Sequence, residues 1–401
     1  MIKVIFLGGL FPKEIKNEIE SKSIGVVQYA ADALQWAIVD GLDLHTKNLR
    51  IVNLPYIGSF PIRYKDVRTK SFGFSHCKGA DDINVGFVNL PLYKLYSRYH
   101  KAKEALKSVL HNDNEVILIY AIHTPFIKAA VDLKKKNPSL KICLIVPDLP
   151  EFMGGSDSIL HKFLKREEKK ILDKLLKKVD TFVLLSKYMN KALNVGVRPW
   201  VRVEGIFNTM DTVINEEKEG FKTLLYSGTL AKRYGILNLL EAFSMIKDKN
   251  YRLWICGDGD AKDELVAMSK KDARIYYFGQ ITRNDVLKLQ KRATVLVNPR
   301  TSEGEYTKYS FPSKTMEYLV SGTPCIMHNL PGIPKEYFDY CFISETQTSL
   351  GLYQTIVSVC ERNQSELNEF GERAKCFIIK NKSPEKQCGK IYKMLKNNNY
   401  A

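Results

Sequence analysis

The chain has 401 residues, of which 45% are hydrophobic and 26% charged, and its formal net charge is +17. This length exceeds what one hydrophobic core usually organises, so we expect two domains of roughly 200 residues each. The composition excludes disordered and collagen-like classes, and the positive charge favours an anionic partner such as nucleic acid, an anionic membrane surface or a phosphorylated ligand.

Apolar runs and cysteines bear on location. No apolar run reaches the roughly 18 to 20 residues that a membrane-spanning helix needs, and residues 1–9, MIKVIFLGG, predict a first strand and not a signal peptide. We therefore expect a cytoplasmic protein or one peripheral to the inner face of the cell membrane. The eight cysteines are scattered without a C-x-x-C pair, which predicts reduced, buried thiols and no metal site.

Strand and helix patterns alternate along the first half of the chain. Residues 3–9 predict a strand, and residues 25–42 follow with apolar side chains at helical spacing. Further strands are predicted at residues 49–55, 115–123, 141–148, 181–186 and 201–207. Near-continuous apolar strands separated by helices indicate a parallel sheet covered on both faces.

The same pattern restarts after a polar segment. Residues 208–221 predict an interdomain linker. Strands are then predicted at residues 222–228, 251–260, 274–281, 293–300, 324–329 and 340–344, with helices at 235–246 and 283–293 among those between them. The sequence therefore predicts an α/β protein with two doubly wound, Rossmann-like parallel-sheet domains facing each other across a cleft, at residues 1–207 and 222–382. Residues 383–401 predict a basic helix that packs back on the first domain.

Ligands of open parallel sheets bind beyond the carboxyl ends of the strands. The predicted strand ends carry Gly8 and Gly9, His123, Gly228, Gly257 with Gly259, Gly279, and the loop 299–313. None forms a Rossmann G-x-G-x-x-G signature, and the acidic residues around Gly257 predict only a supporting role for that turn. Residues 228–236, GTLAKRYGI, form a better candidate than the acidic turn at Gly257. Lys232 and Arg233 come just before a helix, and lysine and arginine are side chains that bind phosphate. A solvated basic loop is the alternative interpretation.

The stretch 309–325, YSFPSKTMEYLVSGTPC, predicts a second anion site at a helix start. Pro312 at the first helical position leaves the amides of Ser313 and Lys314 without intrahelical partners, and the Lys314 ammonium adds positive charge. Glu317 lies about one turn, roughly 5 to 6 Å, deeper on the same face, which matches the step from a nucleotide phosphate to its ribose diol. The alternative is a surface glutamate paired with Lys314.

Together these segments resemble the retaining glycosyltransferases of family 4 (glycosyltransferase group 1), which have the GT-B fold, and in particular members of bacterial capsular and lipid-linked polysaccharide synthesis. The element order is similar over nearly the whole chain, and the specific part is residues 226–243, 257–260, 276–281 and 298–326. The resemblance implies that a nucleotide-diphosphate sugar, with UDP as the expected nucleotide, binds mainly to the second domain, and the acceptor mainly to the first.

The resemblance also implies roles for single residues. Glu317 matches the second glutamate of the family's E-x7-E motif, which binds the ribose hydroxyls, and Ser313 and Lys314 match the helix start that meets the diphosphate. Gly279, Gln280 and Ile281 match the strand end that contacts the base, with Gly257 nearby. In the first domain, Gly8 and Gly9 match a glycine loop near the donor phosphate, His123 a histidine near the donor sugar, and Asp148 an acceptor-side position. A buried histidine bonded to backbone is the alternative for His123.

Two segments depart from the family pattern. Tyr309 stands where the first glutamate of the motif is expected, so Glu303 or Glu305 is a candidate replacement for contacts with the transferred sugar. Thr229 replaces the usual arginine after Gly228, and Tyr234 replaces a lysine, so the charge is assigned to Arg233 with Lys232 as helper.

The expected function is transfer of a sugar from a nucleotide-diphosphate sugar to a glycan or polyprenyl-linked acceptor with retention, in cell-surface polysaccharide synthesis. In the expected mechanism, donors such as Arg233, Lys314 and the helix start stabilise the charge that gathers on the leaving β-phosphate, and His123 lies near the sugar. The family implies no required metal or other cofactor.

The acceptor offers one explanation for the net charge. Residues 158–180 predict an amphipathic helix with many lysines, and residues 90–106 add Tyr93, Tyr96 and Tyr99 among basic residues. Such segments lie on anionic lipid, or else are ordinary core-facing helices with a solvated basic face.

Two rival classes remain. A nucleic-acid-binding protein is suggested by charge alone, but the basic residues are dispersed and no recognised module is present, so nucleic acid is not an expected partner. A non-transferring GT-B protein, either an epimerase-like hydrolase or a catalytically inactive sugar-nucleotide-binding scaffold protein, is kept open by Tyr309.

Overall fold

The structure is a computed structural model that describes residues 2–111, 114–149, 159–208 and 216–399. It divides into two compact units, an N-terminal unit of Met1–Ile206 with Pro384–Ala401 and a C-terminal unit of Phe207–Ser383. Part of the predicted linker, residues 209–215, lies outside the described residues.

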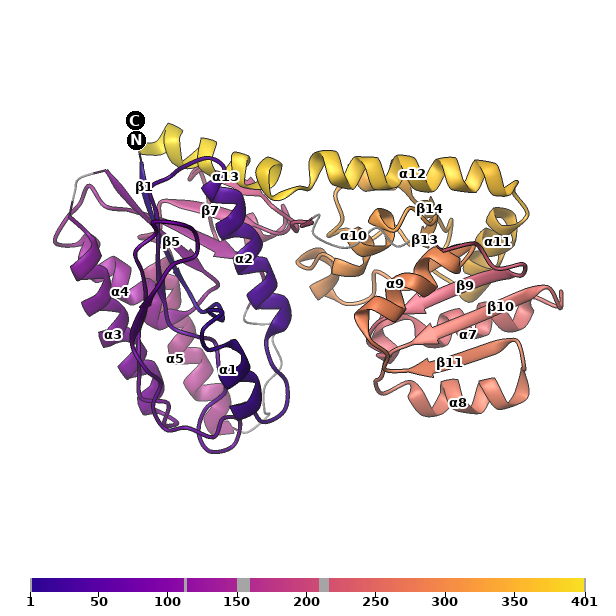
Figure 1. Ribbon diagram of the computed structural model, residues 1–401, viewed down its shortest axis with the longest axis horizontal. Helices are drawn as coiled ribbons and strands as arrows, with labels where there is room; N and C mark the ends of the chain where they lie inside the picture. The colour runs from indigo at the N-terminus through magenta and orange to yellow at the C-terminus, as the bar shows by residue number, and fades with distance from the viewer. Residues whose placement is uncertain (1, 112–113, 150–158, 209–215, 400–401) are drawn as a thin grey trace. The chain divides into compact units, whose positions relative to one another are not determined.

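The N-terminal unit is built on one sheet with the strand order β3-β4-β2-β1-β5-β6-β7-β8 (Figure 1). All neighbouring strands run parallel except β3 and β4. The strands are β1 (Lys3–Gly8), β2 (Leu49–Asn53), β3 (Phe72–Phe74), β4 (Asp82–Asn84), β5 (Glu115–Tyr120), β6 (Lys141–Val146), β7 (Thr181–Leu184) and β8 (Trp200–Arg202). The helices are α1 (Lys16–Lys22), α2 (Tyr29–Asp43), α3 (Tyr93–Val109), α4 (Thr124–Lys134), α5 (Ile159–Leu176), α6 (Met189–Ala192) and α13 (Pro384–Asn399).

Helix α13 closes the N-terminal unit although it comes last in the chain. It lies beside α2, as Figure 1 shows. Cys388 is fully buried in the core with Ile38 and Leu42, and the ring of Tyr392 stacks on His45 with 6.0 Å between centroids. A side chain at Gly41 would meet the backbone of Pro384 at 2.6 Å, so the glycine lets the two helices approach closely.

The C-terminal unit has a fully parallel sheet in the order β11-β10-β9-β12-β13-β14. Its strands are β9 (Lys222–Ser227), β10 (Tyr251–Cys256), β11 (Ile275–Gly279), β12 (Val295–Asn298), β13 (Cys325–Met327) and β14 (Phe342–Ile343). The helices are α7 (Ile236–Met245), α8 (Lys262–Lys271), α9 (Arg283–Arg292), α10 (Ser313–Val320), α11 (Ser349–Cys360) and α12 (Gln364–Asn381), and short 3₁₀ turns include η2 (Lys232–Tyr234), η3 (Glu305–Lys308) and η4 (Lys335–Tyr340). Separate apolar clusters cover the two faces of this sheet, with Leu224 and Ile255 in one and Leu225 and Cys256 in the other.

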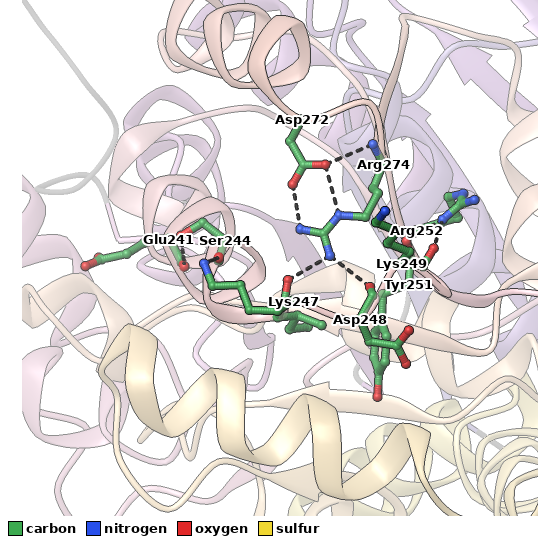
Figure 2. Close-up of polar contacts among 10 residues, drawn as sticks. Glu241, Ser244, Lys247, Asp248, Lys249, Tyr251, Arg252, Asp272 and Arg274 are labelled. Atoms are coloured by element: carbon green, nitrogen blue, oxygen red, sulfur yellow. Dashed lines mark hydrogen bonds and ion pairs between the residues drawn. The ribbon is translucent and has the colours of Figure 1, made fainter.

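Arg274 joins two loops at the amino end of this sheet (Figure 2). Its guanidinium donates to both carboxylate oxygens of Asp272, at 2.9 and 2.7 Å, and to the carbonyls of Ile246 and Asp248, at 2.7 and 2.9 Å. The hydrogen bonds from Arg274, and then its charge, lower the pKa of the Asp272 carboxyl. This contact fixes the start of β11 against the start of β10 at the edge opposite the strand ends where ligands bind.

The predicted fold class is confirmed: both units are α/β and built on parallel sheets. The sequence missed β3 and β4, which have three residues each and no apolar run. Across the part of the chain that the structure describes, no helix is long and apolar enough to cross a bilayer.

Candidate functional site

Two glycine-containing turns meet at the carboxyl ends of β9 and β10. The amide of Gly228 donates to the carbonyl of Cys256 at 3.0 Å, and the amide of Leu230 to that of Asp258 at 2.9 Å. A Cβ atom on Gly257 would lie 1.8 Å from the Gly228 carbonyl oxygen, and Gly257 has φ +133, so the contact requires glycine. The turns form one backbone surface at the ligand-binding edge of the sheet.

Helix α10 begins at this surface. Ser313 is its first residue and Pro312 its N-cap, one position earlier than the sequence predicted for the proline. Within the described residues, no hydrogen bond is found for the backbone amides of Ser313 and Lys314. The Lys314 side chain extends to the Gly228 turn after β9, since its Cε would lie 3.5 Å from a Cβ atom on Gly228. Amides, ammonium and glycine turn therefore converge as an anion site requires.

Glu317 lies next to this group. Its carboxylate accepts from Lys314 Nζ at 3.0 and 3.2 Å and from the side-chain amide of Gln290 at 2.7 Å. The Glu317 side chain keeps 26% of its surface exposed, whereas Gln290 is fully buried. Glu317 is thus paired with Lys314, as expected for a surface glutamate. The buried side-chain amide of Gln290 also donates to the Glu317 carboxylate and orients it.

Tyr318 fixes the position of α10 against β9. Its hydroxyl accepts from the Ser227 amide at 2.9 Å and donates to the Ser227 carbonyl at 3.1 Å. Tyr318 is fully buried, and burial raises the pKa of its hydroxyl well above the usual range. The hydroxyl therefore stays protonated and can make both contacts, which set the distance between the helix start and the Gly228 turn.

Lys232 and Arg233, both predicted to bind phosphate, have different surroundings. The Lys232 ammonium forms an ion pair with Glu264 on α8, and its amide donates to Asp260 at 2.7 Å. The Arg233 guanidinium lies over the rings of Tyr234 and Tyr306, 5.1 and 5.9 Å from their centroids. Of the two, Arg233 has the side chain free of a carboxylate partner among the described residues.

Arg300 joins Arg233 in this stack, and the sequence reasoning did not single it out. Its guanidinium lies 5.2 Å from the Tyr234 centroid and 4.8 Å from the Tyr306 centroid, and donates to Ser310 Oγ at 2.8 Å. Arg300 is 9% exposed, and its Nε atom is buried without a partner among the described residues. The available signal was its position directly after β12, inside the loop 299–313 that the strand-end rule selected.

The loop that departs from the family pattern brings Tyr309 and Glu305 together. The Tyr309 hydroxyl donates to a Glu305 carboxylate oxygen at 3.4 Å. Both Glu303 and Glu305 are exposed, and Gly304 between them has φ +86. Of the two candidate replacement glutamates, Glu305 is therefore the one in contact with the residue at the departing position.

The remaining predicted donor residues lie at neighbouring strand ends. Thr229 accepts a hydrogen bond from the Tyr226 hydroxyl through its carbonyl, at 2.8 Å. Gly279 ends β11 with φ +67, and its carbonyl accepts from the Gly257 amide at 2.8 Å. Gln280 is exposed beside it, whereas Ile281 packs on the apolar cluster of α10. These positions continue the backbone surface from β9 to β11.

In the N-terminal unit the structure brings Gly9 and His123 to the same aromatic group. A Cβ atom on Gly9 would lie 2.5 Å from the ring of Tyr56, and Tyr56 stacks on His123 with 5.6 Å between centroids. Gly8 ends β1, where a Cβ atom would meet the Gln35 amide oxygen at 2.6 Å, and Gln35 in turn accepts from the Gly9 amide at 2.7 Å. This turn is therefore closely packed and held by buried side chains.

His123 is a neutral imidazole. Burial, together with the positive charges of Arg98 and Lys94, lowers the pKa of His123 well below its usual range. Its Nδ1 atom is buried without a hydrogen-bond partner among the described residues. Asp148 follows β6 in an exposed position.

Buried polar groups also lie at the end of β12 and directly after β13. Asn298 Nδ2 and both ring nitrogens of His328 have no partner within the described ranges. His328 is fully buried, and burial lowers its pKa to about 4. Unpaired buried polar atoms are costly unless water or a ligand completes them. Sequence reasoning missed both residues.

Comparisons with known proteins are consistent with this geometry. Residues 209–342 match the family model described as "Glycosyl transferases group 1". Sucrose-phosphate synthase from Thermosynechococcus elongatus superposes with TM-score 0.63 at 15% identity, covering 99% of this chain and 100% of that one. The lipopolysaccharide outer core galactosyltransferase WaaB gives TM-score 0.63 at 14% identity and the same coverages, and Anabaena HepE in complex with UDP gives 0.62 at 12%, also with 99% and 100% covered. No curated protein sequence matches this chain.

At these identities the structural likenesses show the fold, which is GT-B. The matched segment contains the Gly228 turn, Lys314 and Glu317, so the site built above lies inside the group 1 glycosyl transferase match. The class of enzyme defined by this domain is glycosyltransferase.

Proposed function

We propose that this protein transfers a glycosyl group from a UDP-sugar to a glycan or polyprenyl-linked acceptor, with retention at the anomeric carbon, in cell-surface polysaccharide synthesis. The observation that carries the proposal is the convergence of Gly228, the α10 amides, Lys314 and Glu317 at one edge of the sheet. The first three groups suit a diphosphate, and Glu317, supported by Gln290, suits a ribose diol.

The leaving group in such a transfer is a nucleoside diphosphate. As the bond between sugar and phosphate breaks, negative charge gathers on the β-phosphate while the sugar becomes oxocarbenium-like. Lys314, Arg233 and the start of α10 can stabilise that charge, which is the task that a divalent cation performs in metal-dependent transferases. We propose on this basis a reaction that needs no metal, and we propose attack on the face from which the phosphate leaves.

We assign Glu305 and Tyr309 to contacts with the transferred sugar. In the N-terminal unit, we assign His123 to the same role. A neutral imidazole can hydrogen-bond a sugar hydroxyl without adding charge beside an oxocarbenium ion, which fits the lowered pKa of His123. Gly8 and Gly9 are assigned to close backbone approach to donor and acceptor, and Asp148 to the acceptor.

We further propose that the acceptor is presented at an anionic membrane surface on the cytoplasmic side. At the start of α3, four apolar or aromatic side chains are between 48% and 93% exposed: Leu92, Tyr93, Leu95 and Tyr96. The described part of α5 adds exposed lysines, and Ile171 on it is 50% exposed. Aromatic and basic side chains together favour the lipid interface. Co-sedimentation with anionic vesicles at low salt, weakened at moderate salt, is expected; no binding at low salt would refute this part.

The test of the proposed function is turnover of a labelled UDP-sugar onto lipid extract or glycan by the purified chain. We expect incorporation that depends on Glu317 and disappears in Glu317→Ala. Binding of the nucleotide without turnover on any acceptor would favour the scaffold alternative, in which Tyr309 marks loss of the sugar-binding carboxylate. If the chain neither binds the nucleotide nor transfers the sugar, both the transferase proposal and the scaffold alternative are refuted.

A further inference from the structure

Three metal-ligating side chains meet at the end of the N-terminal unit's sheet where β4 begins. Asp43 is the last residue of α2, and His76 and Cys77 are adjacent in the turn between β3 and β4. One carboxylate oxygen, one ring nitrogen and the sulfur all lie within 4.8 Å of one another. Over the described ranges this is the one group of at least three such residues.

The His76 ring is clamped between two carboxylates. Its Nε2 atom lies 3.1 Å from both oxygens of Asp43, and its Nδ1 atom lies 2.6 Å from Asp82 Oδ2. Asp82 is fully buried and also accepts from the amides of Ile51 and His76, at 2.8 and 2.7 Å. A carboxylate on one ring nitrogen orients the other nitrogen toward a metal in many zinc proteins.

The local charge favours a cation. Two carboxylates, those of Asp43 and Asp82, contact the single imidazole of His76, and Asp40 lies three residues before Asp43 on α2. Arg50 is occupied by an ion pair with Asp81. Asp43 also lies at the carboxyl end of α2, where the helix dipole stabilises positive charge.

Cys77 differs from most cysteines of the chain. Six of the eight are buried, and only Cys77 and Cys376 are exposed. The surface therefore offers a thiol to an incoming ion at this site. The cysteine spacing predicted no metal site because the ligands come from separate elements, and the β3–β4 turn that joins them was not predicted.

We propose that Asp43, His76 and Cys77 bind a zinc-like divalent cation, with Asp82 as the residue that orients His76. Two ligands at about 2.0–2.1 Å from one tetrahedral ion lie roughly 3.3 Å apart, close to the 3.1 Å between His76 Nε2 and Asp43. Three protein ligands leave a fourth position for water. The ion binds the unprotonated ring nitrogen and the thiolate, so binding displaces any proton that these two ligand atoms carry.

This site is separate from the proposed transfer reaction. It lies at the start of β4, which runs parallel to β2, whereas Gly8, Gly9 and His123 follow strand ends. A bound ion would join α2 to the β3–β4 turn, and its role is to stabilise the N-terminal unit.

Cobalt substitution tests the proposal on the full chain, kept reduced with a non-thiol reductant after metal removal. We expect one Co²⁺ per chain, a thiolate-to-cobalt charge-transfer band, displacement by Zn²⁺, and a Tm raised by Zn²⁺. The band should vanish in Cys77→Ser and remain in Cys376→Ser, the matched exposed cysteine. Asp82→Asn should weaken zinc binding by about 10- to 100-fold.

Two results would overturn the proposal: absence of the charge-transfer band in the unsubstituted chain, or persistence of the band in Cys77→Ser. Cys77 is exposed, so its substitution leaves the fold intact, and circular dichroism of the metal-free variants checks this. If either result is obtained, the cluster serves only to hold His76 between its two aspartates.

Discussion

Lys314 donates to both carboxylate oxygens of Glu317, at 3.0 and 3.2 Å, within the first turns of α10. Both side chains are partly exposed, at 36% and 26%, and such pairs are worth only about 0–1 kcal/mol. A diphosphate can therefore draw the Lys314 ammonium toward the Gly228 turn and leave Glu317, still held by Gln290, for the ribose.

Lys314→Met should lower turnover far more than it lowers stability. Removing one donor that stabilises developing charge costs about 100- to 1,000-fold in kcat. The matched control is Lys375→Met, because Lys375 forms the same kind of partly exposed pair with Glu372 on α12. Steady-state kinetics with a UDP-sugar checks the prediction; equal activities of the two variants would contradict it.

Arg300→Lys should weaken donor binding by about tenfold, because lysine lacks the planar guanidinium that stacks on Tyr234 and Tyr306 while it donates to Ser310. Arg252→Lys is the control, since Arg252 stacks only on Phe221, 3.8 Å from its centroid. The donor KM of each variant is the measurement. An unchanged KM in Arg300→Lys would exclude Arg300 from the site.

Arg274→Lys should destabilise the C-terminal unit without changing nucleotide binding. Lysine cannot make the two-pronged contact with Asp272 and also reach the Ile246 and Asp248 carbonyls (Figure 2). We expect a loss of roughly 1–3 kcal/mol in urea unfolding. UDP affinity that fell in parallel would show that this edge of the sheet is coupled to the site.

Acid should destabilise the protein partly through His328. Burial lowers its pKa to about 4, from 6.5, so the unfolded chain binds the proton first as pH falls. Stability is then unaffected above pH 6.5 and is lost below it, by roughly 2 kcal/mol at pH 5. His123, also lowered, acts in the same direction. Unfolding free energies at pH 7 and pH 5 should differ less in His328→Gln; an equal difference would contradict this.

The long buried strands were predictable because short apolar runs such as those of β5 and β6, each followed by a helical pattern, are typical of strands in a parallel sheet covered on both faces. Strands β3 and β4 were not, because β4 depends on pairing with β2 and on Asp82, which accepts from the Ile51 amide, and β3 depends on pairing with β4. Their hydrogen bonds link positions that no local pattern connects.

The strand-end rule selected the Gly228 turn and the loop 299–313, and the helix-start pattern selected Lys314 and Glu317. The structure places these groups beside one another, since parallel strands have their carboxyl ends at one edge. Neither pattern could foresee that Gln290, 27 residues before Glu317, supports the carboxylate. Nor could either foresee the stacking of Arg300 on two tyrosines from separate turns. Such contacts are set by tertiary packing.

The central claim is that Glu317 and the start of α10 bind a nucleoside diphosphate, and calorimetric titration of UDP tests it most directly. Unsubstituted chain and Glu372→Gln, whose glutamate pairs with Lys375 on α12, should bind alike. Glu317→Gln should bind about 10- to 100-fold more weakly, because a charged hydrogen-bond acceptor for the ribose is lost. Equal UDP affinity in Glu317→Gln and Glu372→Gln would contradict the account.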